Sequence, residues 1–339
     1  MKIEELKFDG YERVVQGTKD GFRATIAIHN INLGPALGGC RAYDYSDNQS
    51  QVEDTLKLAK GMTYKNALAG LSIGGGKSTL STAGFTEDNL KMFGDLLNHV
   101  NKDGHVYTTA GDVGTTNDDL QVLGKYTPFV NGSTGSDSGI ATAFGVFSAM
   151  KGALRSAGRD IKETTVSVNG YGKVGKRLTK FLLDAGANVI VSDINPLPAD
   201  EFIPGRLGKS AINMAHVNSD VFAPCALGGA LNHKVMDGIA VGHIVCGGAN
   251  NQLASDDIAG RIAEKGIFYV PDYLANSGGV IIVSRRGEDM FDYEYDAPQV
   301  HSKLQALEDT TFAILEESKM TGKFSGDIAD SMAENIFNK

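Results

Sequence analysis

The stretch that decides the fold is Thr165-Val166-Ser167-Val168-Asn169-Gly170-Tyr171-Gly172-Lys173-Val174-Gly175, an apolar run followed by a G-x-G-x-x-G pattern. The β-branched residues predict a strand, and residues 176–185 after the glycines predict a helix. A glycine loop between a strand and a helix brings the backbone close to a pyrophosphate, and the helix start supplies N–H donors. The pattern therefore predicts a dinucleotide site. The residues expected to contact the cofactor are Gly170, Gly172, Lys173, Val174 and Gly175.

A carboxylate at the end of the next predicted strand strengthens this interpretation. Asp193 follows the strand Val189-Ile190-Val191-Ser192. Dinucleotide folds place the acid that binds the ribose hydroxyls of NAD about 20 residues beyond the glycines. A carboxylate here repels a 2′-phosphate and favours NAD over NADP, although Lys173 and Arg177 weaken that preference. The alternative is a tight turn followed by an ordinary surface aspartate.

The order of apolar runs predicts an α/β fold with two domains. From residue 136 to residue 320, strand-like runs alternate with helical segments, which is typical of a doubly wound Rossmann domain that binds NAD. Residues 1–135 combine strands, a hairpin signal at Lys19-Asp20-Gly21 and amphipathic helices, so we expect a mixed α/β domain for substrate binding, catalysis and oligomerisation. A helix near residues 321–339 is expected to join this first domain.

Composition and charge exclude several classes of protein. The chain has 339 residues, a net charge of −9 and 42% hydrophobic residues. The acidic balance argues against nucleic acid or a membrane surface as partner, and the charged start, residues 1–5, does not read as a secretory signal. Cys40, Cys225 and Cys246 form no C-x-x-C pair, so neither a disulfide framework nor a metal site is expected. We expect a cytoplasmic protein.

A second glycine cluster ends in a lysine, Gly74-Gly75-Gly76-Lys77, and Lys65 precedes it. Glycines let a backbone approach a ligand closely. A lysine in apolar surroundings near another cation loses proton affinity and becomes a base near neutral pH. A phosphate-binding P-loop is the rival interpretation, but its first glycine would have to stand at Leu71. A plain glycine loop with a solvated Lys77 is the third.

Asp112 stands among small residues just before a helix that Thr116 is predicted to cap. Taken alone, such an acid is more often a loop or cap residue than a catalyst. Two lysines, one carboxylate and NAD nevertheless fit the oxidation of an α-amino acid. One ammonium binds the substrate carboxylate, the other amine activates water against an imine, and the acid shuttles a proton.

With these motifs in place, the chain resembles the Glu/Leu/Phe/Val amino acid dehydrogenases, and within that family its leucine branch. The resemblance runs through nearly the whole chain and both expected domains. So many blocks in the same order are not expected by chance. They are LGPALGGCR (33–41), KGMTYKN (60–66), GGGK (74–77), DVGTT (112–116), FAPCALG (222–228), ANNQL (249–253) and YVPDY (269–273).

The resemblance implies a role for each residue of the lysine site. Lys77 is expected to be the general base that acts through water, and Asp112 the proton shuttle. Lys65, helped by the backbone around Gly38 and Gly39, is expected to bind the substrate carboxylate. The implied reaction is the reversible oxidative deamination of an L-amino acid by NAD, which gives the 2-oxo acid, ammonia and NADH.

The resemblance also implies the position of the cofactor. Thr142 and Asn251 are expected to contact the nicotinamide side, and Asn276 to line the nicotinamide and substrate cleft. The implied fold places the amino acid in a catalytic cleft between the two domains, whose closure excludes water during hydride transfer. A homo-oligomer is expected, because members of the family form dimers up to octamers.

Four aliphatic residues match the side-chain pocket of the family: Leu37, Ala110, Val280 and Val283. A pocket of this kind favours leucine, valine or isoleucine and offers glutamate no charge partner. Each methylene discriminates by only about 1–3 kcal/mol, so several branched-chain substrates are expected. An aromatic amino acid dehydrogenase, specific for phenylalanine or tryptophan, is the alternative. These four residues could also be plain core.

Several positions depart from the pattern of the leucine branch. Gly111 stands where leucine-specific members commonly carry Glu, and Ile282 stands where they carry Asn. Ser138-Gly139-Ile140 lacks the usual prolines after Asp137, and Ser284-Arg285-Arg286 replaces an acidic stretch. The changes at Ile282 and at the two arginines leave substrate preference and oligomer contacts open, whereas the residues of the chemistry are unchanged.

A non-catalytic regulatory protein that binds NAD is the alternative from another class. Such a protein would need neither Lys77 nor Asp112, so their presence argues against it.

Overall fold

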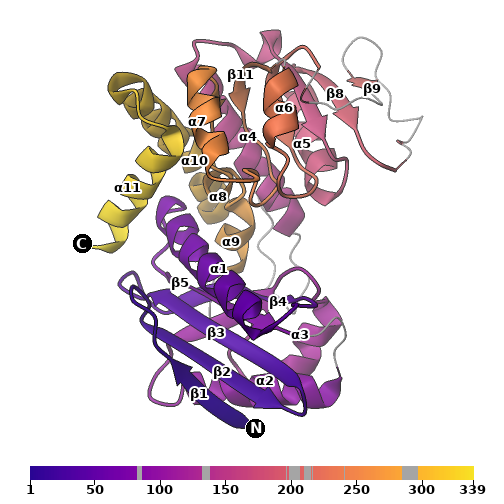
Figure 1. The fold of residues 1–339 in the computed structure, drawn as a ribbon. Helices are drawn as coiled ribbons and strands as arrows, with labels where there is room; N and C mark the ends of the chain where they lie inside the picture. Colours follow the sequence, from indigo (N-terminus) through magenta and orange to yellow (C-terminus); the bar gives the residue numbers. More distant parts are fainter. Residues whose placement is uncertain are drawn as a thin grey trace. The chain divides into compact units, whose positions relative to one another are not determined.

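A computed structural model describes residues 1–81, 86–131, 138–195, 197, 207–209, 215, 217–239, 241–284 and 297–339. The chain divides into two compact units (Figure 1). Unit 1 comprises Met1–Ser136, Val283–Asp292 and Ala333–Lys339, and unit 2 comprises Asp137–Ile282 and Tyr293–Met332. The predicted α/β fold with two domains is thereby confirmed.

Unit 1 is built on a six-stranded mixed sheet with the strand order β1-β2-β3-β5-β4-β6. The strands β1, β2, β3 and β5 pair antiparallel, whereas β4 pairs parallel with both β5 and β6. The strands are β1 (Lys2–Leu6), β2 (Arg13–Lys19), β3 (Phe22–Asn30), β4 (Ala36–Ala42), β5 (Gly74–Leu80) and β6 (Tyr107–Gly111). Its helices are α1 (Asn48–Leu68), α2 (Glu87–Val100) and α3 (Asn117–Leu123).

Local signals in the sequence explain several of these elements. The predicted hairpin joins β2 to β3, with Lys19 opposite Phe22. Asp20 and Gly21 have φ of 49° and 84°, the left-handed conformation that a two-residue hairpin turn requires. Thr116 caps α3, since its side chain accepts the N–H of Asp119. These short-range predictions are confirmed.

The two faces of this sheet differ in chemistry. One face packs against α2 in an apolar core that includes Ile26, Phe93 and Tyr107. The other face carries α1, which crosses the front of the sheet in Figure 1, and part of that contact is polar. The Gln51 side chain donates to the carbonyl of Thr79 at 3.1 Å, and the hydroxyls of Thr55 and Thr79 lie 2.6 Å apart.

The glycine cluster that ends in Lys77 is not a loop but the first half of the buried central strand β5. A Cβ at Gly75 would lie 2.1 Å from the backbone nitrogen of Thr63 in α1, and a Cβ at Gly76 would lie 2.9 Å from the Tyr107 ring. These glycines therefore allow α1 and the Tyr107 ring to pack closely on β5, and they do not form a ligand loop. Lys77 is 5% exposed, so the interpretations as a P-loop and as a loop with a solvated lysine are both wrong.

Unit 2 has a six-stranded parallel sheet with the order β12-β11-β10-β7-β8-β9. Counted along the chain, this is the 3-2-1-4-5-6 arrangement of dinucleotide-binding folds, whose order reverses between β7 and β10. Its strands are β7 (Thr165–Asn169), β8 (Asn188–Ser192), β9 (Leu207–Lys209), β10 (Ser219–Pro224), β11 (Val241–Val245) and β12 (Phe268–Tyr269).

Helices accompany this sheet, as the alternating sequence pattern predicts. They are α4 (Ser138–Ser156), α5 (Lys173–Asp184), α6 (His233–Gly238), α7 (Asp257–Glu264), α8 (Asp272–Ala275), α9 (Gly278–Val283), α10 (Pro298–Thr321) and α11 (Ser325–Phe337), with a short 3-10 turn at Ile161–Glu163. The helix after the glycine loop begins at Lys173, three residues before the predicted start, because Gly172 already serves as its N-cap.

The last residues of the chain contact α1 and the loop after β3. The Tyr64 hydroxyl donates to Glu334 at 2.6 Å, and the Asn32 side chain donates to the carbonyl of Phe337 at 2.9 Å. These contacts lie within unit 1. The predicted domain boundaries at residues 135 and 320 stay a prediction.

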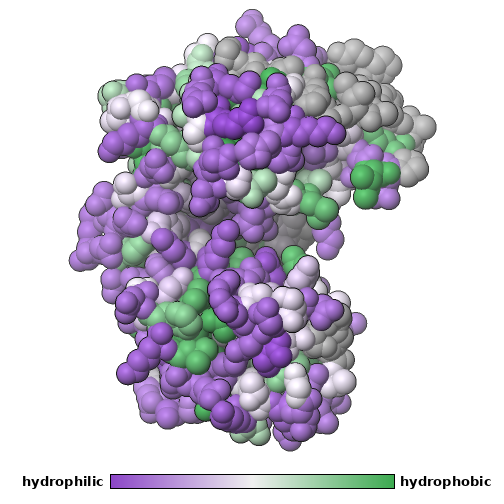
Figure 2. Space-filling view, viewed as in Figure 1, coloured by the Kyte–Doolittle hydropathy of each residue, from purple (hydrophilic) through white to green (hydrophobic). Residues whose placement is uncertain are grey.

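Hydrophilic side chains cover most of the face shown in Figure 2. An apolar patch lies over β2 and β3 of unit 1, and smaller apolar groups lie on unit 2. No helix in the described ranges combines the length and the apolar content that a bilayer span requires. The cytoplasmic location stays a prediction.

The packing of β5 against α1 leads to a first test. Gly75→Ala would force a Cβ into the backbone of α1 and should lower the free energy of unfolding by about 3 kcal/mol or more. Gly61→Ala is the matched control, because a Cβ there meets no described atom within 4 Å. Alanine in that helix interior should stabilise by about 0.5–1 kcal/mol. Thermal unfolding followed by circular dichroism measures both, and an unchanged midpoint for Gly75→Ala would contradict this packing.

Candidate functional site

Strand register gathers the predicted substrate residues of unit 1 on one face of the sheet. Leu37 of β4 lies opposite Gly75 of β5, and Gly39 lies opposite Ala110 of β6. Side chains alternate along a strand, so Leu37, Ala110 and Lys77 share the face that carries α1. The sequence alone did not show this common face, because it depends on which strands are neighbours.

Lys77 and Asp112 form an ion pair. The Lys77 Nζ lies 3.1 Å from Asp112 Oδ2, and the Arg41 Nε donates to the same oxygen at 3.2 Å. Burial raises the pKa of the Asp112 carboxyl, but the charges of Lys77 and Arg41 outweigh burial and leave this pKa below its ordinary value. Asp112 is therefore a carboxylate at neutral pH, a form that can accept a proton.

Arg41 and the acid behind it are site residues that sequence reasoning missed. The Arg41 Nη1 donates to both carboxylate oxygens of Asp54 in α1, at 3.1 and 3.2 Å, and the Tyr45 hydroxyl donates to Asp54 at 2.7 Å. One signal could have identified Arg41. It ends the block at residues 33–41 and follows Leu37 and Gly39 at the two-residue period of a strand.

The ladder between β4 and β5 is interrupted beside Lys77. Leu37 pairs with Gly75, and the pairing resumes at Cys40 with Ser78. A Cβ at Gly38 would lie 1.7 Å from the carbonyl oxygen of Gly76. The two backbones therefore approach more closely than any side chain at position 38 allows.

Lys65 lies on α1 one turn beyond Met62, the residue that covers Gly38. A Cβ at Gly38 would lie 3.2 Å from the Met62 side chain, so this part of α1 lies over β4. Residues three apart on a helix share a face, and the side chain of Lys65 is half-buried.

In unit 2 the glycine loop follows β7 at the point where the strand order reverses. Gly170 has φ of 105°, and a Cβ at Gly175 would lie 1.9 Å from the carbonyl oxygen of Gly170, so the loop packs tightly on itself. Gly172, the N-cap of α5, contributes no side-chain cap, and no described atom lies within 4 Å of a Cβ built there. The loop therefore leaves the helix N–H groups open to an anion.

Asp193 lies beside this loop, as predicted. Its carboxylate accepts the N–H of Tyr171 at 2.7 Å and the N–H of Asn195 at 2.8 Å. The N–H of Asn195 and then that of Tyr171 hold the pKa of this carboxyl below its ordinary value. The side-chain nitrogen of Asn195 also donates to this carboxylate, at 3.1 Å. A carboxylate can accept about four hydrogen bonds, so about one position remains for a ligand hydroxyl. The loop and Asp193 fit a dinucleotide with free ribose hydroxyls.

The other predicted cofactor residues lie on loops and helices of unit 2. Thr142 donates to the carbonyl of Ser138 in α4 at 2.7 Å. Asn251 has φ of 51°, and its N–H donates to Asp272 at 2.9 Å. These hydrogen bonds are made within the protein. The contact of Thr142 and Asn251 with a cofactor stays a prediction.

Asn276 is 6% exposed, and only one end of its side-chain amide is hydrogen-bonded. Its side-chain nitrogen donates to the amide oxygen of Asn250 at 2.7 Å. Its own oxygen is buried, and no described atom donates to it. Buried amides are normally paired, so an unpaired oxygen at such a position is consistent with a missing donor from a ligand.

The pocket residues predicted beyond the first sheet lie on α9. Val280 is 8% exposed, and Ile282, one of the departures from the leucine branch, is 7% exposed on the same helix. The carbonyl of Val283 accepts a hydrogen bond from the Asn131 side chain at 3.1 Å. Asp137, Arg285 and Arg286 lie outside the described residues.

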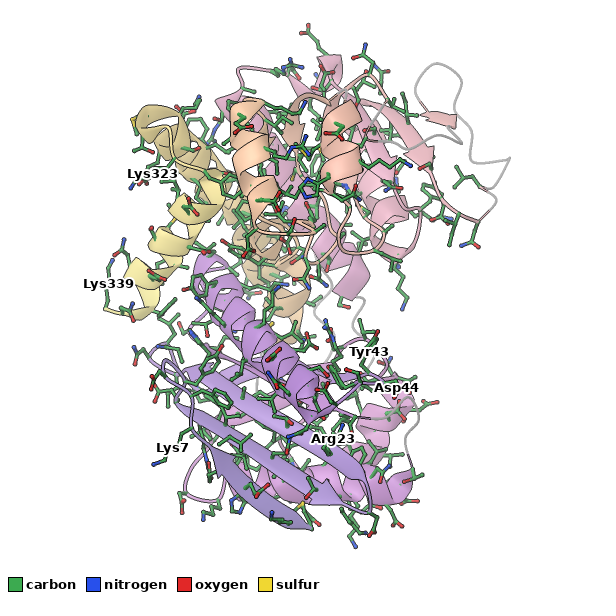
Figure 3. The ribbon with its side chains drawn as sticks, in the orientation of Figure 1. Lys7, Arg23, Tyr43, Asp44, Lys323 and Lys339 are labelled. Atoms are coloured by element: carbon green, nitrogen blue, oxygen red, sulfur yellow. The ribbon has the colours of Figure 1, made fainter. Side chains whose placement is uncertain are left out.

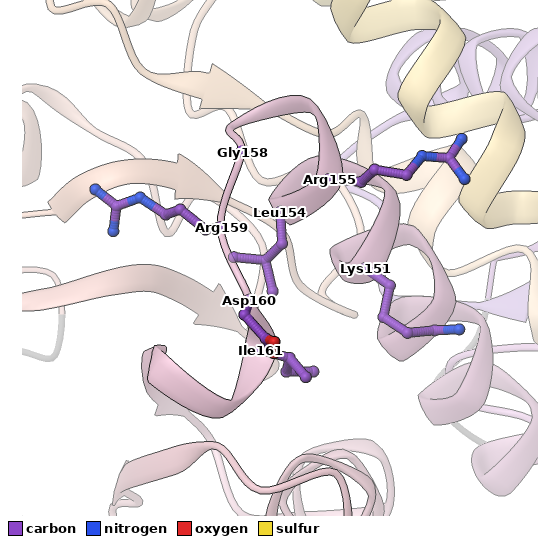
Figure 4. A pocket seen from close by; sticks show the side chains of 7 residues that line it. All are labelled: Lys151, Leu154, Arg155, Gly158, Arg159, Asp160 and Ile161. Carbon is purple, nitrogen blue, oxygen red and sulfur yellow. The ribbon is translucent and has the colours of Figure 1, made fainter.

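A cavity elsewhere in unit 2 is lined by Leu154, Ile161 and three cations, Lys151, Arg155 and Arg159 (Figure 4). In Figure 4 Arg159 points away from Lys151 and Arg155, and all three cations are already paired. Lys151 and Arg155 contact Glu308 and Asp309, at 2.6 and 2.9 Å, and Arg159 pairs with Asp220. Charges that are neutralised in this way do not make an anion site, so we assign this cavity no role.

Comparison with known protein families identifies the family of this chain. Residues 10–128 match the Glu/Leu/Phe/Val dehydrogenase dimerisation domain, and residues 132–201 and 201–323 match the glutamate/leucine/phenylalanine/valine dehydrogenase domain. The chain therefore belongs to the Glu/Leu/Phe/Val dehydrogenase family, and it is an amino acid dehydrogenase. Leucine and valine dehydrogenases of this family depend on NAD, in agreement with the predicted cofactor.

Individual relatives cover almost the whole chain. It is 38% identical to leucine dehydrogenase of Bacillus cereus, over 98% of this chain and 92% of the relative. It is 36% identical to valine dehydrogenase of Streptomyces albus, over 96% of this chain and 92% of the relative. The crystal structure of L-tryptophan dehydrogenase from Nostoc punctiforme matches with a TM-score of 0.84 and 32% identity, over 97% of this chain and 96% of that one.

Proposed function

We propose that the protein catalyses the reversible, NAD-dependent oxidative deamination of branched-chain L-amino acids to 2-oxo acids and ammonia. The observation that carries this proposal is the ion pair of Lys77 and Asp112. It lies on the same sheet face as the aliphatic residues Leu37 and Ala110. An acid–base pair beside an apolar wall suits a substrate whose α-carbon reacts while its side chain stays inert.

Each residue of unit 1 has a proposed part in the reaction. Lys65 binds the substrate carboxylate and fixes the orientation of the α-carbon. The amine of Lys77 takes a proton from the water that attacks the imine carbon. Asp112, a carboxylate in the ligand-free protein, accepts a proton from the substrate nitrogen and returns it to the leaving ammonia. Lys77 and Asp112 lie within hydrogen-bond distance of each other, so a proton can pass directly between them. The proton that Lys77 takes from water is released to solvent before the next turnover.

The residues of unit 2 are proposed to hold the cofactor. The N–H groups at the start of α5 bind the pyrophosphate, and Asp193 accepts the ribose hydroxyls. Thr142, Asn251 and Asn276 contact the nicotinamide side. When bound, NAD supplies the acceptor for the hydride of the α-carbon.

The substrate preference is argued from the size of the side chains. Leu37 and Ala110 are 4% and 7% exposed, and Val280 and Val283 are of similar, aliphatic character. Such side chains leave room for a branched aliphatic group, and the leucine and valine dehydrogenases among the relatives support this size. The similarity to a tryptophan dehydrogenase favours an aromatic substrate as the second candidate.

We also propose that the protein works as a homo-oligomer. The match of residues 10–128 to a dimerisation domain supports self-association through unit 1. The number of subunits stays open.

A substrate panel tests the proposed function. Purified protein with NAD at alkaline pH should form NADH with leucine, valine and isoleucine, and kcat/KM for these should exceed that for phenylalanine and tryptophan by about tenfold or more. Absorbance at the NADH band gives the initial rates. A tenfold preference for aromatic substrates would replace the first candidate with the second, and no NADH with any amino acid would leave only a nucleotide-binding protein.

The two lysines should respond differently to substitution. Lys77→Ala should reduce kcat by about 10²-fold or more, with NAD affinity nearly unchanged, because the nucleotide residues lie in unit 2. Lys65→Ala should mainly raise the KM for leucine. Lys57→Ala, which removes an exposed lysine from the same helix, is the control. Loss of NAD binding by Lys77→Ala, measured by fluorescence titration, would show that the division of roles is wrong.

The nucleotide preference should depend on Asp193. Asp193→Ala removes the acceptor for the ribose hydroxyls and the charge that repels a 2′-phosphate, so the ratio of kcat/KM for NAD to that for NADP should fall by about tenfold or more. Asp184→Ala, which removes an exposed carboxylate at the end of α5, should leave the ratio unchanged. An unchanged ratio in Asp193→Ala would rule out the ribose contact.

A further inference from the structure

Arg41 connects two carboxylates that belong to different elements. Its Nε donates to Asp112, which follows β6, and its Nη1 donates to both oxygens of Asp54 in α1. A guanidinium has a rigid planar fork of donors, whereas a lysine ammonium on a flexible stem does not. The Arg41 side chain is 17% exposed, so these contacts are partly shielded from water and salt.

Asp112 is held by two cations with different properties. Lys77 and Arg41 contact the same oxygen, Oδ2, at 3.1 and 3.2 Å. In the proposed function, Lys77 gains and loses a proton in each turnover, so the positive charge that it places beside Asp112 is present in only part of the cycle. Arg41 stays charged throughout, because its guanidinium does not deprotonate in proteins. Arg41 is thus the permanent partner of Asp112 while the proton moves.

Arg41 is itself fixed from behind. Asp54 holds the far side of the guanidinium, and the Tyr45 hydroxyl, donating to Asp54 at 2.7 Å, fixes the carboxylate in turn. With Lys77 charged, the cluster of Lys77, Arg41, Asp54 and Asp112 has two positive and two negative charges. A balanced cluster can be buried at lower cost than a single unpaired charge.

We propose that Arg41, anchored by Asp54 and Tyr45, is a positioning residue that keeps Asp112 ionised and oriented toward Lys77 during proton transfer. This inference rests on the proposed function, and it assigns Arg41 no contact with substrate or cofactor. Without Arg41 and with Lys77 neutral, neither cation would offset the effect of burial on Asp112, and burial favours the protonated acid.

The pH dependence follows from the groups around Asp112. Removing the positive charge of Arg41 destabilises the ionised form of Asp112 and raises its pKa, so the protonated form persists to higher pH. The charged and titratable groups of this cluster are Lys77 from β5, Arg41 from β4, Tyr45 after β4, Asp54 from α1, Asp119 from α3, and Cys40 and Tyr107 on the opposite face.

The test is the pH profile of Arg41→Gln with leucine and NAD. The acidic limb of kcat/KM should move to higher pH by about one unit, which corresponds to the loss of one close charge. At neutral pH kcat should fall by about tenfold or more, while the KM for leucine changes by less than about threefold. Arg13→Gln is the matched control, because Arg13 also forms an ion pair in unit 1, with Glu5 on the edge strand.

Two further variants separate positioning from folding. Arg41→Gln combined with Asp54→Asn removes one charge of each sign, so thermal stability should recover relative to Arg41→Gln alone, while the acidic limb stays shifted. Arg41→Lys keeps the charge but not the fork, so its acidic limb should lie near that of the unsubstituted protein while kcat stays reduced. Asp44→Asn, at an exposed position labelled in Figure 3, controls for loss of a carboxylate near β4.

The outcomes are distinct. If the unsubstituted protein turns over normally but the acidic limb is unshifted in Arg41→Gln and in Arg41→Gln with Asp54→Asn, this inference is overturned. The proposed function then still stands. A KM for leucine that rises by more than about tenfold with an unshifted limb also overturns it, because Arg41 would then bind the substrate. No NADH formation by the unsubstituted protein overturns the proposed function and this inference together.

Discussion

The close approach of three backbones around Gly38 and Gly75 is the constraint on which unit 1 depends. A Cβ at Gly75 would strike the backbone of α1, and a Cβ at Gly38 would strike the carbonyl oxygen of Gly76. Only glycine permits α1, β4 and β5 to meet at these distances. Because they do meet, the side chain of Lys77 extends from the buried strand β5 to Asp112. Lys65 lies one helical turn beyond Met62, which covers Gly38.

Short-range patterns predicted much of this fold. The strand, the glycine loop and Asp193 were enough to predict unit 2, since each signal is local and each has one geometric meaning. The hairpin at Asp20 and Gly21 was predictable for the same reason. The glycines before Lys77 were harder to interpret. A glycine next to a ligand and a glycine next to a helix look alike in a sequence, and the long-range contact with Thr63 decides between them.

The sequence provided candidate residues for the site but not their arrangement. The chemistry of two lysines and an acid pointed to Lys65, Lys77 and Asp112, yet nothing local connects Arg41 with Asp54, which lies on another element. Ion pairs between elements depend on strand order and on the direction in which a helix crosses the sheet. Strand order and helix direction cannot be read from a single sequence. A cluster of compensating charges is therefore recognised only when the fold is known.

The alternation of side chains along β4 and into the loop after β6 brings aliphatic and charged residues to the same face of the sheet, at different positions of shared elements. Leu37 and Arg41 belong to one strand, and Ala110 and Asp112 lie two residues apart in the chain, so the two aliphatic residues and the two charged ones share a backbone but not positions. A substitution at Leu37 or Ala110 therefore leaves the charged residues in place. On the proposed function, a lineage with this framework could change the size of the amino acid it accepts by a few point substitutions and keep Lys77, Asp112 and Arg41 unaltered.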